Sequence, residues 1–319
     1  MYIKNIVRRI IKQVWGIDGI SIFIQKNRKK LFKRLYRKKY SADDIICVMT
    51  KMGMKEGSVV FVHSAMTEFY NYTGDPVELI EKIIEKIGPE GTLMMPAYPK
   101  KKGELFKEAS ETENIVFDIN KTCSGAGLLT EVFRKYPNVK RSINLQHSVC
   151  GYGKLANYFL NEHQLSEFAW DSHSPYYKLT QMDALIFCIG LESYLRNVTI
   201  IHCVETLLKD KYSYFSSFFG KKLEYRYLDV EGKIGVHKMI LPIKTGVRSK
   251  HVIKHHFDRK YLKRFRLSNL LIESVDSRYM FNKCLELVEN GISIYSSPSY
   301  KNHMENGKFI KIDHSDIID

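Results

Sequence analysis

Residues 58–98 read SVVFVHSAMTEFYNYTGDPVELIEKIIEKIGPEGTLMMPAY and alternate between two kinds of pattern. The first seven residues, SVVFVHS, form a β-branched apolar run with the length of a buried strand. Asp75-Pro76 then opens a helical pattern, because proline is favoured at the first helical position. The turn GPEG at 88–91 ends that helix, and residues 92–98 (TLMMPAY) predict a second strand. This strand–helix–strand order predicts an α/β fold with a partly parallel sheet.

The alternation of strands and helices continues on both sides of this stretch. Ser41 and Asp44 have the spacing of a capping box, which predicts a helix that runs to Gly53. We expect a buried strand at 184–190, antiparallel strands within 214–239, and further helices at 125–136, 151–163, 199–210 and 270–289. The fold class predicted from this order is α/β, with a layered α/β/α domain around a central mixed sheet.

The composition is that of a globular protein of the cytoplasm. The chain has 319 residues, of which 44% are hydrophobic, and no apolar run approaches the roughly 18 residues of a membrane-spanning helix. The first sixteen residues, MYIKNIVRRIIKQVWG, place Lys or Arg in every turn, unlike a signal peptide. The six cysteines are scattered without a C-x-x-C pair, which argues against a zinc site and a disulfide framework. We expect reduced thiols and no bound metal.

Most of the net charge of +15 lies at the N-terminus. Residues 1–40 contain 13 Lys or Arg and one acid, Asp18, so they carry +12 and leave +3 for residues 41–319. The sequence therefore divides into a basic amphipathic N-terminal helical extension, 1–40, and a near-neutral domain, 41–319. The extension has the pattern of a peripheral membrane contact. A solvated helix or a contact in a homo-oligomer is the alternative.

Several chemistries are excluded by the absence of their motifs. The chain has no G-x-S-x-G nucleophile elbow, no Walker loop and no G-x-G-x-x-G. A second basic cluster at 244–266 has nine Lys or Arg against Asp258, but it matches no nucleic-acid-binding module. We therefore expect no nucleic-acid partner.

Polar residues gather where the expected strands end, which is where open α/β sheets bind their ligands. The first strand ends in His63-Ser64-Ala65 and the second in Tyr98. His147 lies in a polar run and could act as a general base, because the ordinary pKa of histidine is near neutrality. His202 and Glu205 stand three residues apart on one helix and can face the same way. A helix-capping His147 and a surface His202–Glu205 pair are the alternatives.

In series, these motifs resemble the aminoglycoside 3-N-acetyltransferase family. The resemblance preserves order and spacing over roughly residues 41–210 and is looser in the C-terminal third. The motifs that carry it are GSVVFVHS at 57–64, IGPEGTLMMP at 87–96, SGAG at 124–127 with Glu131, Arg134 and Pro137, Arg141-Ser142, HSV at 147–149, Gly153, His163, SPY at 174–176 with Leu179, and Thr199, His202 and Glu205.

The resemblance implies an antibiotic N-acetyltransferase-like fold and direct transfer of acetyl from acetyl-CoA to an amine. It implies that His147 is the general base and that a carboxylate, assigned here to Glu205, orients it. It further implies that the following residues contact the two substrates. The CoA side comprises His63, Ser64, Ala65, Ser124, Gly125 and Ser148, with the backbone N–H groups of Ser124 and Gly125 offered to a CoA phosphate. The acceptor side comprises Tyr98, Asp171, His173 and His202.

Two departures from the family pattern concern the acceptor. Asn144-Leu145 stands where the family usually has His-Pro, and WDSH at 170–173 stands where it tends to have glycine with an acid. With the basic cluster at 244–266, they favour a small anionic acceptor, a nucleotide-linked amino sugar for surface polysaccharide synthesis. An aminoglycoside antibiotic is the alternative substrate. A non-enzymatic surface-binding protein is the alternative of another class.

Overall fold

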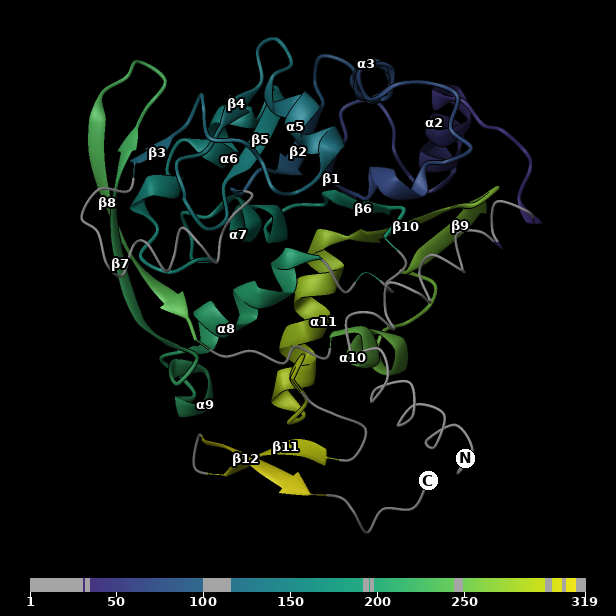
Figure 1. The fold of residues 1–319 in the computed structure, drawn as a ribbon. Helices are drawn as coiled ribbons and strands as arrows, with labels where there is room; N and C mark the ends of the chain where they lie inside the picture. The colour runs from purple at the N-terminus through teal and green to yellow at the C-terminus, as the bar shows by residue number, and fades with distance from the viewer. Residues whose placement is uncertain are drawn as a thin grey trace, which may run out of the picture.

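The computed structural model describes residues 31, 35–99, 116–191, 195, 198–243, 249–295, 300–305 and 308–313. Its centre is a seven-stranded mixed sheet in the order β4-β5-β2-β1-β6-β10-β9 (Figure 1). The strands are β1 (Val59–Ser64), β2 (Thr92–Pro96), β4 (Lys140–Arg141), β5 (Val149–Gly153), β6 (Leu185–Ile189), β9 (Lys263–Leu267) and β10 (Leu270–Asp276).

The three central strands are parallel, as the strand–helix–strand order predicts. Val60 of β1 pairs with Leu93 of β2 on one side and with Leu185 of β6 on the other. β5 and β10 flank them antiparallel, and β4 and β9 continue antiparallel to the two edges. Because β1, β2 and β6 run in one direction, their carboxyl ends share one edge of the sheet.

One face of the sheet is covered by helices that precede or link the central strands. They are α2 (Ala42–Lys51), α3 (Pro76–Ile87) and α5 (Leu128–Arg134). The capping box of α2 is present, with the Ser41 hydroxyl accepting from Asp44 N and the Asp44 carboxylate accepting from Ser41 N. Ile83 and Phe133 are fully buried with Val62 and Met95 in this layer.

The other face carries the second helical layer, so the α/β/α arrangement is confirmed. It contains α6 (Ala156–Leu160), α7 (Pro175–Thr180), α8 (Cys203–Leu208), α10 (Ser249–His256) and α11 (Ser277–Glu289). The 3-10 turn η3 (Thr199–His202) leads into α8. Tyr176, Cys203, Ile253 and Met280 from these helices share one apolar core with Phe61 of β1.

Two smaller sheets lie beside this core (Figure 1). β7 (Phe219–Leu228) and β8 (Ile234–Pro242) form a long antiparallel hairpin, as expected within 214–239. β3 (Val116–Asp118) adds parallel to β7. β11 (Tyr300–Glu305) and β12 (Lys308–Asp313) form a separate hairpin. Short helical turns complete the described part: η1 (Met66–Glu68), η2 (His163–Leu165) and α9 (Ser213–Ser216).

Two sequence predictions of helices are wrong in their first halves. Residues 149–153 are strand β5, not the start of a helix at 151, and only Ala156–Leu160 are helical. Residues 270–276 are strand β10, and the helix begins at Ser277 with Asp276 as its N-cap. Both strands are buried at their centres by pairing with β2 and β6, and this tertiary context outweighs helical spacing in the sequence.

The predicted N-terminal extension lies almost entirely outside the described residues. Tyr40, at the predicted boundary, is 1% exposed, stacks near Tyr72 and donates its backbone N–H to Asn71. The division at residues 40 and 41 stays a prediction, with Tyr40 packed in the body of the domain. No helix in the described part is long and apolar enough to cross a bilayer.

Candidate active site beyond the parallel strands

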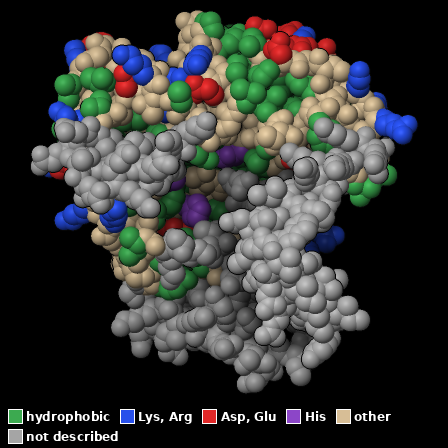
Figure 2. Space-filling view, in the orientation of Figure 1, with side chains coloured by type: hydrophobic (Ala, Val, Ile, Leu, Met, Phe, Trp, Pro, Cys, Tyr) green, Lys and Arg blue, Asp and Glu red, His purple; other side chains and the backbone are tan. Residues whose placement is uncertain are grey.

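The candidate site lies at the edge of the sheet where β1, β2 and β6 end. β1 delivers His63 and Ser64, and Ala65 N donates to the carbonyl of Ile189 at the end of β6. His63 faces the layer of α7 and α8, since its ring lies 4.9 Å from Phe61. Figure 2 shows histidine side chains in a hollow of the face that it draws.

A row of rings joins β1 to the loops beyond it. The Phe61 ring lies 5.6 Å from Tyr176, and Tyr176 lies 6.1 Å from His147 in an edge-to-face contact. His147 is 4.9 Å from Trp170, which stacks on His202 at 4.7 Å with an interplanar angle of 21°. The structure therefore brings both predicted residues, His147 and His202, into contact with one tryptophan.

Glu205 is a buried carboxylate at the end of this row. Its Oε1 atom lies 2.8 Å from His202 Nδ1 and accepts a hydrogen bond of 2.8 Å from the Tyr295 hydroxyl. With Glu205 Oε1 as the acceptor of this hydrogen bond, His202 Nδ1 carries a proton, and in neutral His202 the other nitrogen is then an acceptor. Glu205 is 1% exposed, and its Oε2 has no hydrogen-bond partner among the described residues.

The imidazole that Glu205 holds is therefore His202. The family resemblance implies instead that a carboxylate orients His147. The rings of Trp170 and His202 connect Glu205 with His147, so its influence on His147 passes through both. The buried Glu205 also raises the pKa of Tyr295, after the larger effect of burial itself. This keeps the Tyr295 hydroxyl protonated as a donor.

The loop that bears His147 is fastened to the rest of the domain. The Asn144 side chain accepts from the backbone N–H groups of Gln146 (3.0 Å) and His147 (2.9 Å). Leu145 N donates to the Tyr225 hydroxyl at 2.8 Å. Asn144-Leu145, which departs from the family pattern, thus forms a tight polar turn held by the β7–β8 hairpin.

His237 completes the anchor of that loop. The Tyr225 hydroxyl lies 2.6 Å from His237 Nδ1, and His237 Nε2 donates to the Ser166 carbonyl at 2.7 Å. Burial lowers the pKa of His237, so it stays neutral and can accept from Tyr225. Sequence reasoning missed both residues, because they belong to a distant hairpin with no local motif.

Asp171 and His173 have different surroundings. The Asp171 carboxylate accepts from Phe168 N at 3.0 Å and from His173 N at 3.1 Å, so it shapes the turn before α7. The His173 ring is directed to Glu162, with Nδ1 3.9 Å from a carboxylate oxygen, rather than into the row of rings. The structure thus gives Asp171 a shaping role, and the acceptor contacts of both residues stay predictions.

On the CoA side, the predicted N–H donors already have partners. Ser124 N donates to the Glu131 carboxylate at 2.7 Å, and Gly125 N donates to the Tyr98 carbonyl at 2.7 Å. The Arg134 guanidinium beside Glu131 holds the pKa of that carboxyl at about 2, so Glu131 is charged. A phosphate would compete with Glu131 at this turn, and the phosphate role of Ser124 and Gly125 stays a prediction.

Ser148 is fully buried in a network around Arg141. Its hydroxyl donates to the Ala97 carbonyl at 2.7 Å and accepts from two Arg141 nitrogens at 3.3 Å. Arg141 also donates to the carbonyls of Thr122 and Ile119. Burial lowers its pKa to about 10, which leaves it charged at neutral pH. The network fixes three loops around the candidate site, and a CoA contact of Ser148 stays a prediction.

Of the two other predicted residues at the strand ends, His63 is buried and Tyr98 is partly buried. Burial lowers the pKa of His63 to about 4, so its imidazole is neutral at physiological pH. Burial raises the pKa of Tyr98, which stays protonated. Trp170, Tyr176 and Tyr295 extend the predicted set, and of these only the first two lie in segments that sequence reasoning had singled out. Among the described residues, no three His, Cys, Asp or Glu side chains form a metal-binding group.

A three-layered α/β domain with parallel central strands, and with a histidine–carboxylate pair beyond their ends, belongs to the class of α/β proteins that bind ligands at the carboxyl edge of the sheet. The aminoglycoside 3-N-acetyltransferase family model matches residues 61–289. The chain belongs to this family.

Relatives and solved structures agree with that assignment. The YokD protein of Bacillus subtilis, an aminoglycoside N(3')-acetyltransferase-like protein from prophage SPbeta, is 31% identical over 156 residues. That alignment covers 44% of this chain and 56% of YokD. Aminoglycoside N(3)-acetyltransferase III of Pseudomonas aeruginosa is 23% identical over 167 residues, covering 50% of this chain and 60% of the relative. The chain thus spans less than two thirds of the length of these two relatives.

The solved structures confirm the fold. The crystal structure of YokD has a TM-score of 0.61 at 21% identity and covers 79% of this chain and 100% of its own. The structure of AAC-IIIb in a binary complex with CoASH has a TM-score of 0.65 at 17% identity, with coverages of 82% and 100%.

Proposed function

We propose that this protein transfers acetyl from acetyl-CoA directly to an amine of an amino sugar, with an aminoglycoside-type polyamine as the acceptor. The observation that carries the proposal is the row from His147 through Trp170 and His202 to Glu205. It lies beyond parallel strands in a chain of the aminoglycoside 3-N-acetyltransferase family. The names of the matched relatives support the same chemistry and acceptor class.

Charge near the row favours a cationic acceptor over the anionic one that the sequence suggested. Glu205 has no Lys or Arg within ion-pair distance among the described residues, and one of its oxygens lacks a hydrogen-bond partner. A buried carboxylate attracts an ammonium group more strongly than an exposed one, since the local dielectric constant is low. The nucleotide-linked amino sugar is therefore the second candidate acceptor. The basic cluster at 244–266 is the feature that favours it, because Lys and Arg side chains could bind its phosphates.

The reaction requires a base and an oriented pair of reactants. The acceptor ammonium first releases one proton to solvent. A neutral imidazole then takes a second proton from the amine nitrogen as that nitrogen forms a C–N bond with the thioester carbonyl. The C–S bond breaks, and the imidazolium returns the proton to the departing thiolate. The proposed donors to the oxyanion are the Ser64 hydroxyl and backbone N–H groups beyond Ala65, because Ala65 N already donates to the Ile189 carbonyl. The buried cysteines take no part, because the transfer is direct.

Two imidazoles compete for the role of base. His147 is the base implied by the family resemblance, and we retain it as the proposed proton acceptor. His202 is favoured by a specific contact, since Glu205 fixes its tautomer with Nε2 as the acceptor in the neutral ring. If His147 is the base, His202 and Glu205 position Trp170 and bind the acceptor. If His202 is the base, His147 positions Trp170.

The test compares His147→Asn and His202→Asn in an assay of thiol release from acetyl-CoA with an aminoglycoside. Loss of the base lowers kcat by about 100-fold or more, while loss of a positioning residue lowers it by about tenfold. Glu205→Gln should follow His202→Asn if His202 is the base. His255→Asn, an exposed histidine on α10, is the matched control. Transfer that is undiminished in both variants would overturn the mechanism.

The same assay distinguishes the two acceptor classes from each other and from a non-enzymatic surface-binding protein. Turnover of an aminoglycoside without turnover of a nucleotide-linked amino sugar supports the first acceptor, and the reverse supports the second. A chain that transfers acetyl to neither, although it is folded, would be a non-enzymatic binding protein. Contact with an anionic membrane through residues 1–40 remains a separate proposal, because those residues are almost all outside the described part.

A further inference from the structure

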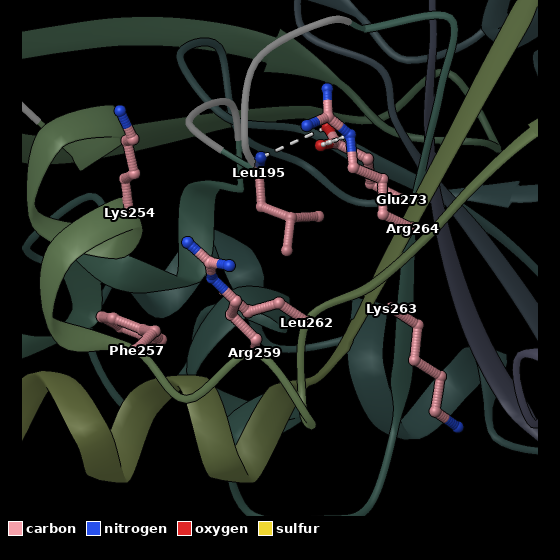
Figure 3. Close-up of a pocket in the computed structure, with 8 residues that line it drawn as sticks. All are labelled: Leu195, Lys254, Phe257, Arg259, Leu262, Lys263, Arg264 and Glu273. Atoms are coloured by element: carbon pink, nitrogen blue, oxygen red, sulfur yellow. Dashed lines mark hydrogen bonds and ion pairs between the residues drawn. The ribbon is translucent and has the colours of Figure 1, made fainter.

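A cavity lies away from the row of rings, between α10, the 257–262 turn, the edge strand β9 and its neighbour β10. Its volume is about 310 Å³. Eight residues line it: Leu195, Lys254, Phe257, Arg259, Leu262, Lys263, Arg264 and Glu273 (Figure 3). Its four basic side chains come from the cluster at 244–266, which lies outside the motifs that carry the family resemblance.

The cavity has an excess of positive charge. Glu273 is its single acid, and its side chain is 3% exposed and paired with Arg264 Nε at 3.3 Å. Lys263 points away, with its amine donating to the Met52 carbonyl at 2.9 Å. Lys254 and Arg259 have no carboxylate within ion-pair distance among the described residues. Two cations therefore remain for a ligand, and an anion is the ligand that they favour.

The walls between the cations are apolar. Phe257 is 6% exposed and Leu195 is 2% exposed, and Leu262 lies beside Arg259 (Figure 3). A volume near 300 Å³ is at the lower end of the range for small-molecule pockets. Apolar walls with a cationic rim suit a ligand that joins a flat base to phosphates. This combination favours a nucleotide over a bare inorganic anion.

The cavity is connected to the candidate active site through one row of the sheet. His63 of β1 pairs with Cys188 of β6, Cys188 with Glu273 of β10, and Glu273 with Arg264 of β9. Directly paired residues point to the same face, so all four side chains face the layer of α10 and α11. Three strand spacings of about 4.8 Å place Arg264 on the order of 14 Å from His63.

We infer that this cavity, with Lys254 and Arg259 as its ligand cations, binds the phosphorylated nucleoside of a substrate. The inference rests on the proposed acetyl transfer for the identity of that substrate. CoA carries an adenine nucleotide at the far end of its pantetheine arm, and a nucleotide-linked amino sugar carries a nucleoside diphosphate beside the sugar. The shared chemistry is a nucleoside diphosphate, and both sources remain arms of the test.

The first experiment measures binding without catalysis, by isothermal titration of the full chain with ADP and with UDP. In the double variant Lys254→Gln/Arg259→Gln, each nucleotide that binds should bind at least about tenfold more weakly, because two charge-assisted contacts are lost. Both side chains are exposed, so the fold should persist, which a melting temperature checks. Lys260→Gln is the matched control: Lys260 neighbours Arg259 but pairs with Asp258 at 3.4 Å. It should leave the affinity unchanged.

The second experiment identifies the source. If CoA supplies the nucleotide, the double variant raises the KM for acetyl-CoA about tenfold and leaves the KM for an aminoglycoside unchanged. If the acceptor supplies it, the double variant raises the KM for a nucleotide-linked amino sugar instead. Equal affinity of the wild type and the double variant for both nucleotides, or no measurable binding of either to the wild type, overturns the inference. Failure of the proposed function has another signature: nucleotides bind, but no amine is acetylated.

Discussion

At the scale of single residues, burial decides the protonation state of the groups around the strand ends. His63 on β1 is 7% exposed, and burial depresses its pKa to about 4. Tyr98 and Tyr295 are shifted in the opposite direction and stay protonated. The candidate site therefore contains a neutral His63 and the protonated Tyr98 and Tyr295, of which Tyr295 donates to the buried carboxylate of Glu205.

His63→Gln should change how stability depends on pH. The pKa of His63 is lower in the folded chain, about 4, than the ordinary value of about 6.5, so the unfolded chain binds the proton first. The contribution of His63 to the free energy of unfolding is therefore fully present above about pH 6.5. It decreases by about 3 kcal/mol at most as the pH falls from about 6.5 to about 4. His63→Gln removes this part of the slope, which urea unfolding at several pH values measures.

The control for that prediction is His255→Gln, which replaces an exposed histidine. Its unfolding free energy should depend on pH as that of the wild type does. A His63→Gln variant with the wild-type slope between pH 6.5 and pH 4 would show that His63 takes up its proton in the folded chain as readily as in the unfolded one.

At the scale of elements, the structure separates what local pattern can predict from what pairing decides. The helices with caps, at Ser41 and Asp75, and the strand VVFVHS were predictable because each carries its own signals. β5 was not, because Gly151 and Gly153 look like a helix start but serve close approach to β2. His202 and Glu205 were predictable from their spacing.

The remaining members of the site come from distant elements. Tyr295 follows α11, and Tyr225 lies on β7, so each meets its partner only in the folded chain. Trp170 lies in a segment that departs from the family pattern, yet its contacts with His147 and His202 depend on the turn that Asp171 shapes. Long-range packing of this kind leaves no periodic signal in the sequence.

Gly153→Ala should destabilise the sheet strongly. Gly153 has a φ of +107°, and a Cβ there would overlap the Gly91 carbonyl oxygen. Unfavourable backbone conformation and the clash together should cost about 3 kcal/mol or more. Gly232→Ala is the matched control, because Gly232 has a φ of +80° but a Cβ there would have no atom within 4 Å. Its cost should be about 1 kcal/mol; equal costs in urea unfolding would contradict the steric argument.

Tyr225→Phe should loosen the loop that bears His147. The change leaves Leu145 N without its acceptor and removes the donor to His237. We expect a loss of about 1–3 kcal/mol in unfolding free energy and a severalfold decrease in kcat with little change in KM. Tyr227→Phe, two residues along the same strand, is the control and should leave kcat unchanged. Steady-state kinetics and denaturant unfolding measure the two effects, and an unchanged kcat would remove the positioning role.

At the scale of the whole molecule, charge is distributed unevenly between two regions. Residues 1–40 carry +12 of the net +15, and the cavity by α10 draws on the cluster at 244–266. The rest of the domain is close to neutral. The net charge of the chain therefore arises mainly from two separate basic regions with different expected ligands. Residues 1–40 are expected to bind an anionic bilayer, and the cavity by α10 is expected to bind a nucleotide.

Removal of residues 1–35 should abolish the expected membrane binding without affecting nucleotide binding at the cavity by α10. We expect the full chain to sediment with anionic vesicles at low salt and to be released at high salt, because surface charges are screened. The shortened chain should remain unbound at both salt concentrations while it keeps its affinity for ADP. Equal vesicle binding of the two chains would remove the proposed membrane contact of residues 1–40.

The antiparallel pairing of β6 with β10 also determines when the sheet can be completed during translation. Ile189 of β6 pairs with Ile272 of β10, so a strand at the centre of the sheet lacks one neighbour until much later in translation. Until then, the nascent chain presents an apolar strand with an open edge, which is a template for association with other chains. Synthesis should therefore depend on chaperones that shield this edge, and a stop codon between the two strands should yield an aggregating product rather than a smaller enzyme.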